Sequence, residues 1–155
     1  MNGCSSRPAT PPAPARSETW VAPARLEMIP ELRRRVCQFA AAIGFDADAL
    51  DDIRLAVGEA LANAVRHGCG NDPRCKVCVR ADAKPDRLVI EVEDPGGGFD
   101  PERLVARPLG STEPGGFGLH FMRSVMDRVT VAVRPDATVV RLEKALAPEE
   151  PGRSE

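Results

Sequence analysis

Aromatic side chains are scarce in this sequence, making up 4% of its 155 residues, with one tryptophan and no tyrosine. Excess charge is lacking as well, because 21 basic side chains stand against 23 acidic ones and the formal net charge is −2. The chain therefore has neither the rings on which bases stack nor a broad positive field that attracts nucleic acid or anionic lipid. A nucleic-acid-binding function is disfavoured.

Long hydrophobic runs are also absent. No apolar stretch approaches the roughly 20 residues that span a bilayer, and the N-terminus lacks the apolar core of a signal peptide. We therefore expect a cytoplasmic protein that does not enter a membrane.

Cysteine is present at five positions, an odd number that, without a secretion signal, favours reduced thiols over a disulfide framework. The group Cys69, Cys75 and Cys78 suggests a zinc site. However, strand alternation would place Cys75 and Cys78 on opposite faces, and no fourth ligand is evident. Zinc is therefore disfavoured.

Composition divides the chain into a folded part and two tails. Residues 1–17 are rich in proline and in small polar residues, and residues 147–155 have the same character. Such segments cannot bury enough apolar surface to offset the entropy of ordering, so we expect disorder in both. The remaining residues, 18–146, are enough for one domain with a hydrophobic core.

Two segments have the apolar spacing of helices. The first runs from Pro30 to Gly44 and the second is capped by Asp46 or Asp48 and ends before Gly68. Their apolar positions are Leu32, Val36, Phe39, Ala40 and Ile43 in the first, and Ile53, Val57, Ala60, Leu61 and Ala64 in the second. Both read as amphipathic helices with one face for a core.

Strand-like alternation follows at 76–81 and 88–92, around a turn at 84–86. Glycine and proline then crowd residues 94–116, which favours a ligand-binding loop over regular structure. A helix at 119–126 and strands at 128–134 and 138–144 complete the chain. This order predicts an α/β fold, a two-layer sandwich of a mixed, mainly antiparallel sheet with helices on one face.

Three groups of residues are candidates for chemistry. Glu59, Asn63 and His67 recur every four positions on the second helix, so we expect all three on one face, away from the apolar stripe. A solvated polar face is the alternative interpretation.

The second group follows a predicted strand and comprises Asp94, Gly96, Gly98 and Phe99. A carboxylate at the end of a strand can accept hydrogen bonds from an amine, and the glycines let the backbone approach a flat ligand. The alternative is a glycine-rich surface turn.

The third group, Gly115, Gly116, Gly118 and Leu119, directly precedes a helix, where free amide groups suit phosphate oxygens. The sequence does not match two other glycine-rich nucleotide-binding motifs. Phe121 occupies the third glycine of a dinucleotide fingerprint, and Gly116 and Phe117 replace the Lys and Ser/Thr of a P-loop.

Taken in order, the three groups resemble the N, G1 and G2 boxes of the GHKL ATPases. The stretches LAVGEALANAVRHG (55–68) and VMDRV (125–129) are similar to the anti-sigma-factor serine kinases of the RsbW and SpoIIAB type. The resemblance covers nearly all of residues 18–146 and implies the GHKL (Bergerat) ATP-binding fold.

The resemblance also implies residue functions and ligands. ATP and Mg²⁺ would be the cofactors, with Asn63 as a metal ligand, Glu59 as general base and Asp94 at the adenine amine. Thr138 matches a threonine that the family places near adenine, although Ala137 replaces the usual glycine before it. Mg²⁺ prefers oxygen ligands, which agrees with Asn63.

The function implied is that of a protein serine/threonine kinase that phosphorylates an anti-sigma-factor antagonist and sequesters a sigma factor, with a homodimer expected. The alternative is a catalytically silent ATP-binding module that sequesters a partner. A sensor histidine kinase is disfavoured because the two histidines, His67 and His120, do not precede the nucleotide boxes.

Overall fold

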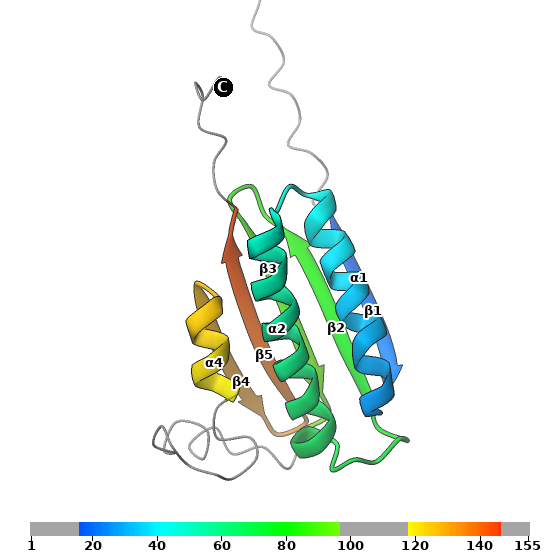
Figure 1. Cartoon of the computed structure of the whole chain (residues 1–155). Helices are drawn as coiled ribbons and strands as arrows, with labels where there is room; N and C mark the ends of the chain where they lie inside the picture. Colours follow the sequence, from blue (N-terminus) through cyan, green and yellow to red (C-terminus); the bar gives the residue numbers. More distant parts are fainter. Residues whose placement is uncertain (1–15, 97–117, 147–155) are drawn as a thin grey trace, which may run out of the picture.

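A single five-stranded sheet forms one layer of the molecule (Figure 1). The computed structural model describes residues 16–96 and 118–146. The strands are β1 (Ser17–Pro23), β2 (Lys76–Ala83), β3 (Arg87–Asp94), β4 (Arg128–Arg134) and β5 (Ala137–Ala145). Their order is β1-β2-β3-β5-β4, and every neighbouring pair is antiparallel. The predicted fold class is confirmed, but the described strands make no parallel pair, so the sheet is not mixed.

In the part of the chain that the structure describes, three helices form the second layer. They lie on the same side of the sheet (Figure 1). They are α1 (Ile29–Ala42), α2 (Ala47–Asn63) and α4 (Gly118–Val125). Two short turns accompany them, the 3₁₀ turn η1 (Leu26–Met28) and the π-helical turn η2 (Ala64–Gly68). The core lies between the layers, and its most buried large side chains include Val36, Ile53, Leu61, Val79, Leu88, Ile90, Met122 and Leu142.

The ends of α1 and α2 follow from local chemistry. Pro30 lies in the first turn of α1, where a missing amide hydrogen is tolerated, and Gly44 takes a φ of +113° just beyond its end. The Asp46 side chain caps α2 by accepting a hydrogen bond of 2.8 Å from the Ala49 amide. Of the two predicted caps, Asp46 is therefore the one used.

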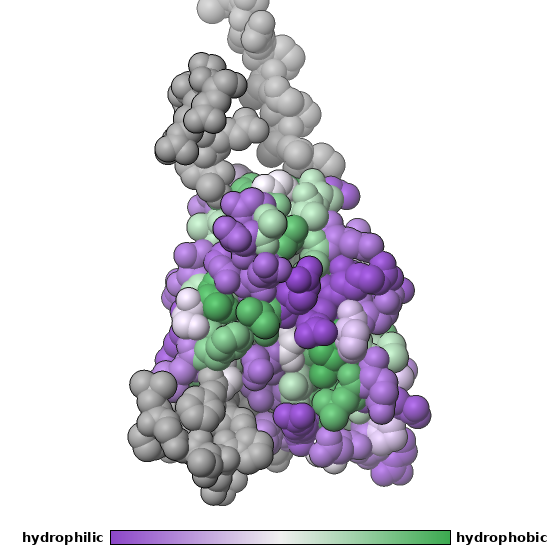
Figure 2. Space-filling view, in the orientation of Figure 1, coloured by the Kyte–Doolittle hydropathy of each residue, from purple (hydrophilic) through white to green (hydrophobic). Residues whose placement is uncertain are grey.

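Charged residues cover the outer surface of the helical layer, which is largely hydrophilic in Figure 2. Glu31 and Arg34 of α1 form an ion pair of 2.7 Å, and Asp51 and Arg54 of α2 form one of 2.9 Å. None of the described helices is long and apolar enough to cross a membrane.

Strand β1 was not predicted from the sequence. It begins at Ser17, inside the segment assigned to the N-terminal tail, and pairs with β2 along its whole length. Only Trp20 and Ala22 of this edge strand turn toward the core, so its apolar alternation is too short to stand out. Residues 1–15 and 147–155 lie outside the described residues, so the two predicted tails stay predictions there.

A disulfide joins Cys69 and Cys75, whose Cα atoms are 5.7 Å apart. The expectation that these thiols are reduced was wrong. The turn after η2 folds back to the start of β2 and brings together two cysteines that are six positions apart. Among the described residues, Cys37 and Cys78 carry free thiols.

Candidate functional site

Four element ends meet at one end of the molecule (Figure 1). These are the end of α2 with η2, the end of β3, the start of β5 and the start of α4. The described members of all three predicted groups belong to these ends or the turn after β3. The antiparallel pairing of β3 with β5 is the reason that residues 94 and 138 lie side by side.

Asp94 is the last residue of β3 and is only 4% exposed. Its Oδ1 atom accepts a hydrogen bond of 2.8 Å from the Gly96 amide. Burial raises the pKa of the Asp94 carboxyl, while the Gly96 amide lowers it and Glu93 raises it. In the described part of the chain, no ion pair brings a basic side chain to this carboxyl. Asp94 is therefore a buried acceptor with remaining hydrogen-bonding capacity.

Thr138 lies directly opposite Asp94 in the sheet and is 1% exposed. Its Oγ1 atom has no hydrogen-bond partner in the described part of the chain. A buried hydroxyl without a partner costs free energy, so an external group that pairs with it would be favoured. Asp94 and Thr138 thus offer a carboxylate and a hydroxyl at one place.

Two glycines allow the backbone to approach this pair closely. A Cβ atom added to Gly68 would overlap the Asp94 carboxylate, so only glycine leaves that side chain its space. Gly96 has a φ of +76°, and a Cβ atom there would lie 3.0 Å from the Ala137 backbone nitrogen. The backbone therefore comes close to the Asp94 carboxylate at Gly68 and close to Ala137, the residue before Thr138, at Gly96.

Asn63 and Glu59 lie one helical turn apart near the end of α2, facing the start of α4. A Cβ atom added to Gly118 would lie 2.9 Å from Asn63 Nδ2 and 3.4 Å from Glu59 Oε2. Asn63 is 5% exposed, and its Nδ2 atom has no hydrogen-bond partner among the residues that the structure describes. The structure therefore brings the first and third predicted groups together at Gly118.

His67 lies beyond the regular part of the helix that carries Glu59 and Asn63. α2 ends at Asn63, and the wider π-helical turn η2 replaces the spacing of 100° per residue on which the expectation of one common face depended. The Cys69 amide closes this turn with a 2.8 Å hydrogen bond to the Ala64 carbonyl. His67 is exposed, whereas Asn63 is buried.

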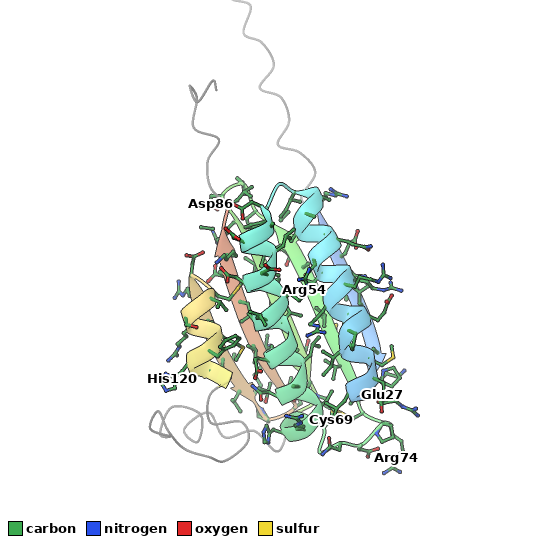
Figure 3. The ribbon with its side chains drawn as sticks, in the orientation of Figure 1. Glu27, Arg54, Cys69, Arg74, Asp86 and His120 are labelled. Atoms are coloured by element: carbon green, nitrogen blue, oxygen red, sulfur yellow. A yellow bond between two sulfur atoms is a disulfide. The ribbon has the colours of Figure 1, made fainter. Side chains whose placement is uncertain are left out.

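The remaining predicted residues divide into core and undescribed positions. Leu119 is 2% exposed and packs in the hydrophobic core, while His120 is exposed on α4 (Figure 3). Gly98, Phe99, Gly115 and Gly116 lie outside the described residues.

Sequence reasoning missed one important position. Gly68 was interpreted only as a stop for the second helix, whereas it adjoins Asp94. The only available signal was the His67-Gly68 pair at the end of the first motif, and the contact itself depends on tertiary packing.

The chemistry of this end fits an adenine nucleotide. Adenine carries an exocyclic amine, for which the buried Asp94 is an acceptor, and ring nitrogens, for which the Thr138 hydroxyl is a donor. Asn63 and the backbone at Gly118 provide an amide group and a helix N-terminus, which suit a metal ion and phosphate oxygens.

Comparison with known proteins agrees with this geometry. The family model of the histidine kinase-like ATPase domain matches residues 22–144. The chain belongs to this family. Its ligand is therefore ATP, and its fold is the ATP-binding fold that the resemblance implied.

Two relatives show to which branch of the histidine kinase-like ATPase family this chain is similar. A serine-protein kinase RsbW of Bacillus licheniformis is 34% identical over 126 residues, which are 76% of this chain and 78% of the relative. An anti-sigma F factor of Geobacillus stearothermophilus is 32% identical over 118 residues, which are 73% of this chain and 81% of that protein. This member of the family is accordingly an ATP-dependent protein serine/threonine kinase of the anti-sigma type.

A solved structure shares the fold. It is described as the crystal structure of the RsbU and RsbW domains of Rv1364c from Mycobacterium tuberculosis, and it aligns with a TM-score of 0.65 at 20% sequence identity. The alignment covers 88% of this chain and 34% of that longer one.

Proposed function

We propose that this kinase binds Mg·ATP at the end of the sheet formed by Asp94 and Thr138. It would use the γ-phosphoryl group to phosphorylate a serine or threonine of an anti-sigma-factor antagonist. The observation that carries the proposal is the convergence of three buried polar side chains, Asp94, Thr138 and Asn63, beside glycine backbone. Two of the three have atoms without partners among the described residues.

Each residue has a separate function in the proposal. Asp94 and Thr138 hold the adenine ring through its amine and a ring nitrogen, and Gly68 keeps the Asp94 carboxyl in place. Asn63 supplies an amide oxygen to Mg²⁺, which neutralises phosphate charge when it is bound. Gly118, with Gly115 and Gly116, supplies amide groups for phosphate oxygens, and His67, Gly98, Phe99 and Leu119 complete the proposed binding residues.

Glu59 is the general base of the proposal. Phosphoryl transfer needs little covalent help from the protein, but the attacking hydroxyl must be positioned and must lose its proton. Glu59 is half-buried and lies one helical turn from Asn63, so its carboxylate can accept that proton close to the metal ligand. The relatives named serine-protein kinase RsbW favour a kinase over a catalytically silent module.

The partners in the proposal are an antagonist protein as phosphoryl acceptor and a sigma factor as the sequestered protein, both in the cytoplasm. We propose that the kinase acts as a homodimer, which sedimentation equilibrium would test. A mass of one chain at micromolar concentration, with and without ATP, would contradict the dimer.

The decisive experiment has two steps. Calorimetry with ADP and Mg²⁺ tests the nucleotide site, and incubation with γ-labelled ATP and proteins encoded by neighbouring genes tests transfer. Label in an antagonist protein supports the kinase. Nucleotide binding together with ATP-dependent binding of a sigma factor, but without label in any partner, would favour the silent module.

A further inference from the structure

The Cys69–Cys75 disulfide closes a loop beside the proposed nucleotide site. Cys69 directly follows the π-helical turn η2, and Cys75 directly precedes β2. Both are half-buried and pack against the core. Figure 3 shows Cys69 at the end of the helix that carries Asn63, with Arg74 at the outer side of the loop. The bond therefore ties the end of this helix to the sheet.

Backbone hydrogen bonds hold the same loop independently of the disulfide. The Asn71 amide donates to the Val65 carbonyl at 2.9 Å, and the Cys75 amide donates to the Asp72 carbonyl at 3.0 Å. The Cys75 carbonyl in turn accepts a 2.8 Å bond from the Ala24 amide. Because these bonds do not need the disulfide, its reduction should loosen the loop without unfolding the domain.

The loop is coupled to Asp94 through one residue. Gly68 precedes Cys69 in the chain, and its backbone lies so close to the Asp94 carboxylate that an added Cβ atom would overlap it. The Cys69 amide also closes the π-helical turn by bonding to the Ala64 carbonyl. A shift of the backbone at Cys69 therefore changes the space around Asp94.

We propose that the Cys69–Cys75 pair is a redox switch for the nucleotide site, a proposal that rests on Asp94 binding adenine. In the disulfide form, the tied loop keeps Gly68 against Asp94, and the site is ordered before nucleotide arrives. In the dithiol form, nucleotide binding must first order the loop, so its affinity is lower.

The chemistry is thiol–disulfide exchange with an external dithiol. One thiolate of the reductant attacks Cys69 or Cys75, the protein S–S bond breaks, and a mixed disulfide forms. The second thiol of the reductant then resolves this intermediate. Two electrons and two protons pass to the protein, which ends with two thiols, and the reductant ends as its disulfide.

Calorimetry with ADP tests the switch on the full-length chain, once oxidised and once after treatment with dithiothreitol. The reduced protein should bind ADP about fivefold or more weakly, the lower range of typical coupling between sites. Cys69→Ser/Cys75→Ser should bind like the reduced form and should not respond to dithiothreitol. Cys37→Ser/Cys78→Ser is the matched control and should keep the full response, because these thiols are free.

Peptide-resolved alkylation accompanies the measurement. Cys69 and Cys75 should resist alkylation in unfolded oxidised protein and react after reduction, and labelling without reductant would overturn the switch. Equal ADP affinity in both forms would also overturn it but leave the proposed nucleotide site intact. Absence of ADP binding in both forms would refute the nucleotide site and the switch together. If the double serine variant does not fold, the two forms of the unmodified chain decide the question.

Discussion

Asp94 is buried and accepts one backbone hydrogen bond, which leaves its carboxyl able to accept more. A carboxyl that is 4% exposed and carries a raised pKa destabilises the folded chain unless something else compensates. The Gly96 amide donates one hydrogen bond to it. An adenine amine would be a second donor.

Replacing this acceptor should weaken nucleotide binding. Asp94→Asn keeps the shape of the side chain but presents an amide where the adenine amine needs a carboxylate. A hydrogen bond to a charged group contributes about 1.5–3 kcal/mol, so ADP affinity should fall roughly 10- to 100-fold in calorimetry. Glu93→Gln, at the exposed neighbouring position, is the control and should bind normally. An unchanged affinity for Asp94→Asn would remove Asp94 from the site.

Gly68 is a positioning residue that acts through Asp94. In Gly68→Ala the new methyl group would overlap the Asp94 carboxylate, so that side chain must move. We expect loss of most ADP binding in calorimetry with retention of the fold by circular dichroism. Gly58→Ala on α2 is the control, because its Cβ atom would meet only the Arg33 side chain, which can shift. Normal ADP binding by Gly68→Ala would show that the close approach is not required.

Glu59 and Asn63 lie one helical turn apart on α2, but substitutions of the two should impair different steps. Glu59→Gln removes the proposed base and leaves the amide of Asn63, so Mg·ATP binding should survive while phosphorylation of the antagonist falls by about 10²- to 10⁴-fold. Asn63→Ala should weaken Mg·ATP binding itself. Radiolabel transfer and calorimetry on both variants provide the comparison. Phosphorylation by Glu59→Gln at the unmodified rate would contradict the mechanism.

At the scale of elements, α2 is the most important support of the site. It carries Glu59 and Asn63 near its C-terminal end and begins at the Asp46 cap, which binds the Ala49 amide. Asp46→Ala should lower the free energy of unfolding by about 1 kcal/mol in urea denaturation. Asp48→Ala should lower the free energy of unfolding by less, because Asp48 lies in the first turn but does not cap the helix. Equal losses would mean that charge in the first turn matters more than the cap.

The helices and inner strands were predictable because their apolar periods are long. The α2 stripe of Ile53, Val57, Ala60 and Leu61 is buried as expected, and β2 to β5 lie close to their predicted ranges. Asp94 and Thr138 could be named from their motifs. Their register across β3 and β5 required the sheet.

The features that sequence could not provide all depend on packing between distant or irregular segments. β1 turns only Trp20 and Ala22 inward, so its signal is too weak for periodicity. The π-helical turn η2 breaks the regular spacing that was assumed for His67. The disulfide was missed because an odd cysteine count describes the whole chain and says nothing of one pair that a turn brings together.

At the scale of the whole molecule, the cost of the buried Asp94 links nucleotide binding to stability. The folded pKa of this carboxyl lies above the 3.8 of an ordinary aspartate, so the folded state holds its proton more tightly than the unfolded state. As pH rises through the window from the unfolded pKa to the folded one, stability is therefore lost. Above that window, the charged carboxyl opposes folding of the nucleotide-free protein.

This linkage predicts opposite effects of one substitution. Without nucleotide at pH 8, Asp94→Asn should melt at a higher temperature than the unmodified chain, and the difference should shrink as the pH falls toward 3.8. With ADP at about 100 times its dissociation constant, the unmodified chain should gain about 2.7 kcal/mol, or roughly 5–10 °C in melting temperature. The variant at the same ADP concentration should gain much less. Thermal melts by circular dichroism across this pH range measure both effects, with Glu93→Gln as the control. A nucleotide-free variant that melts lower than the unmodified chain at pH 8 would show that Asp94 stabilises the fold rather than the complex.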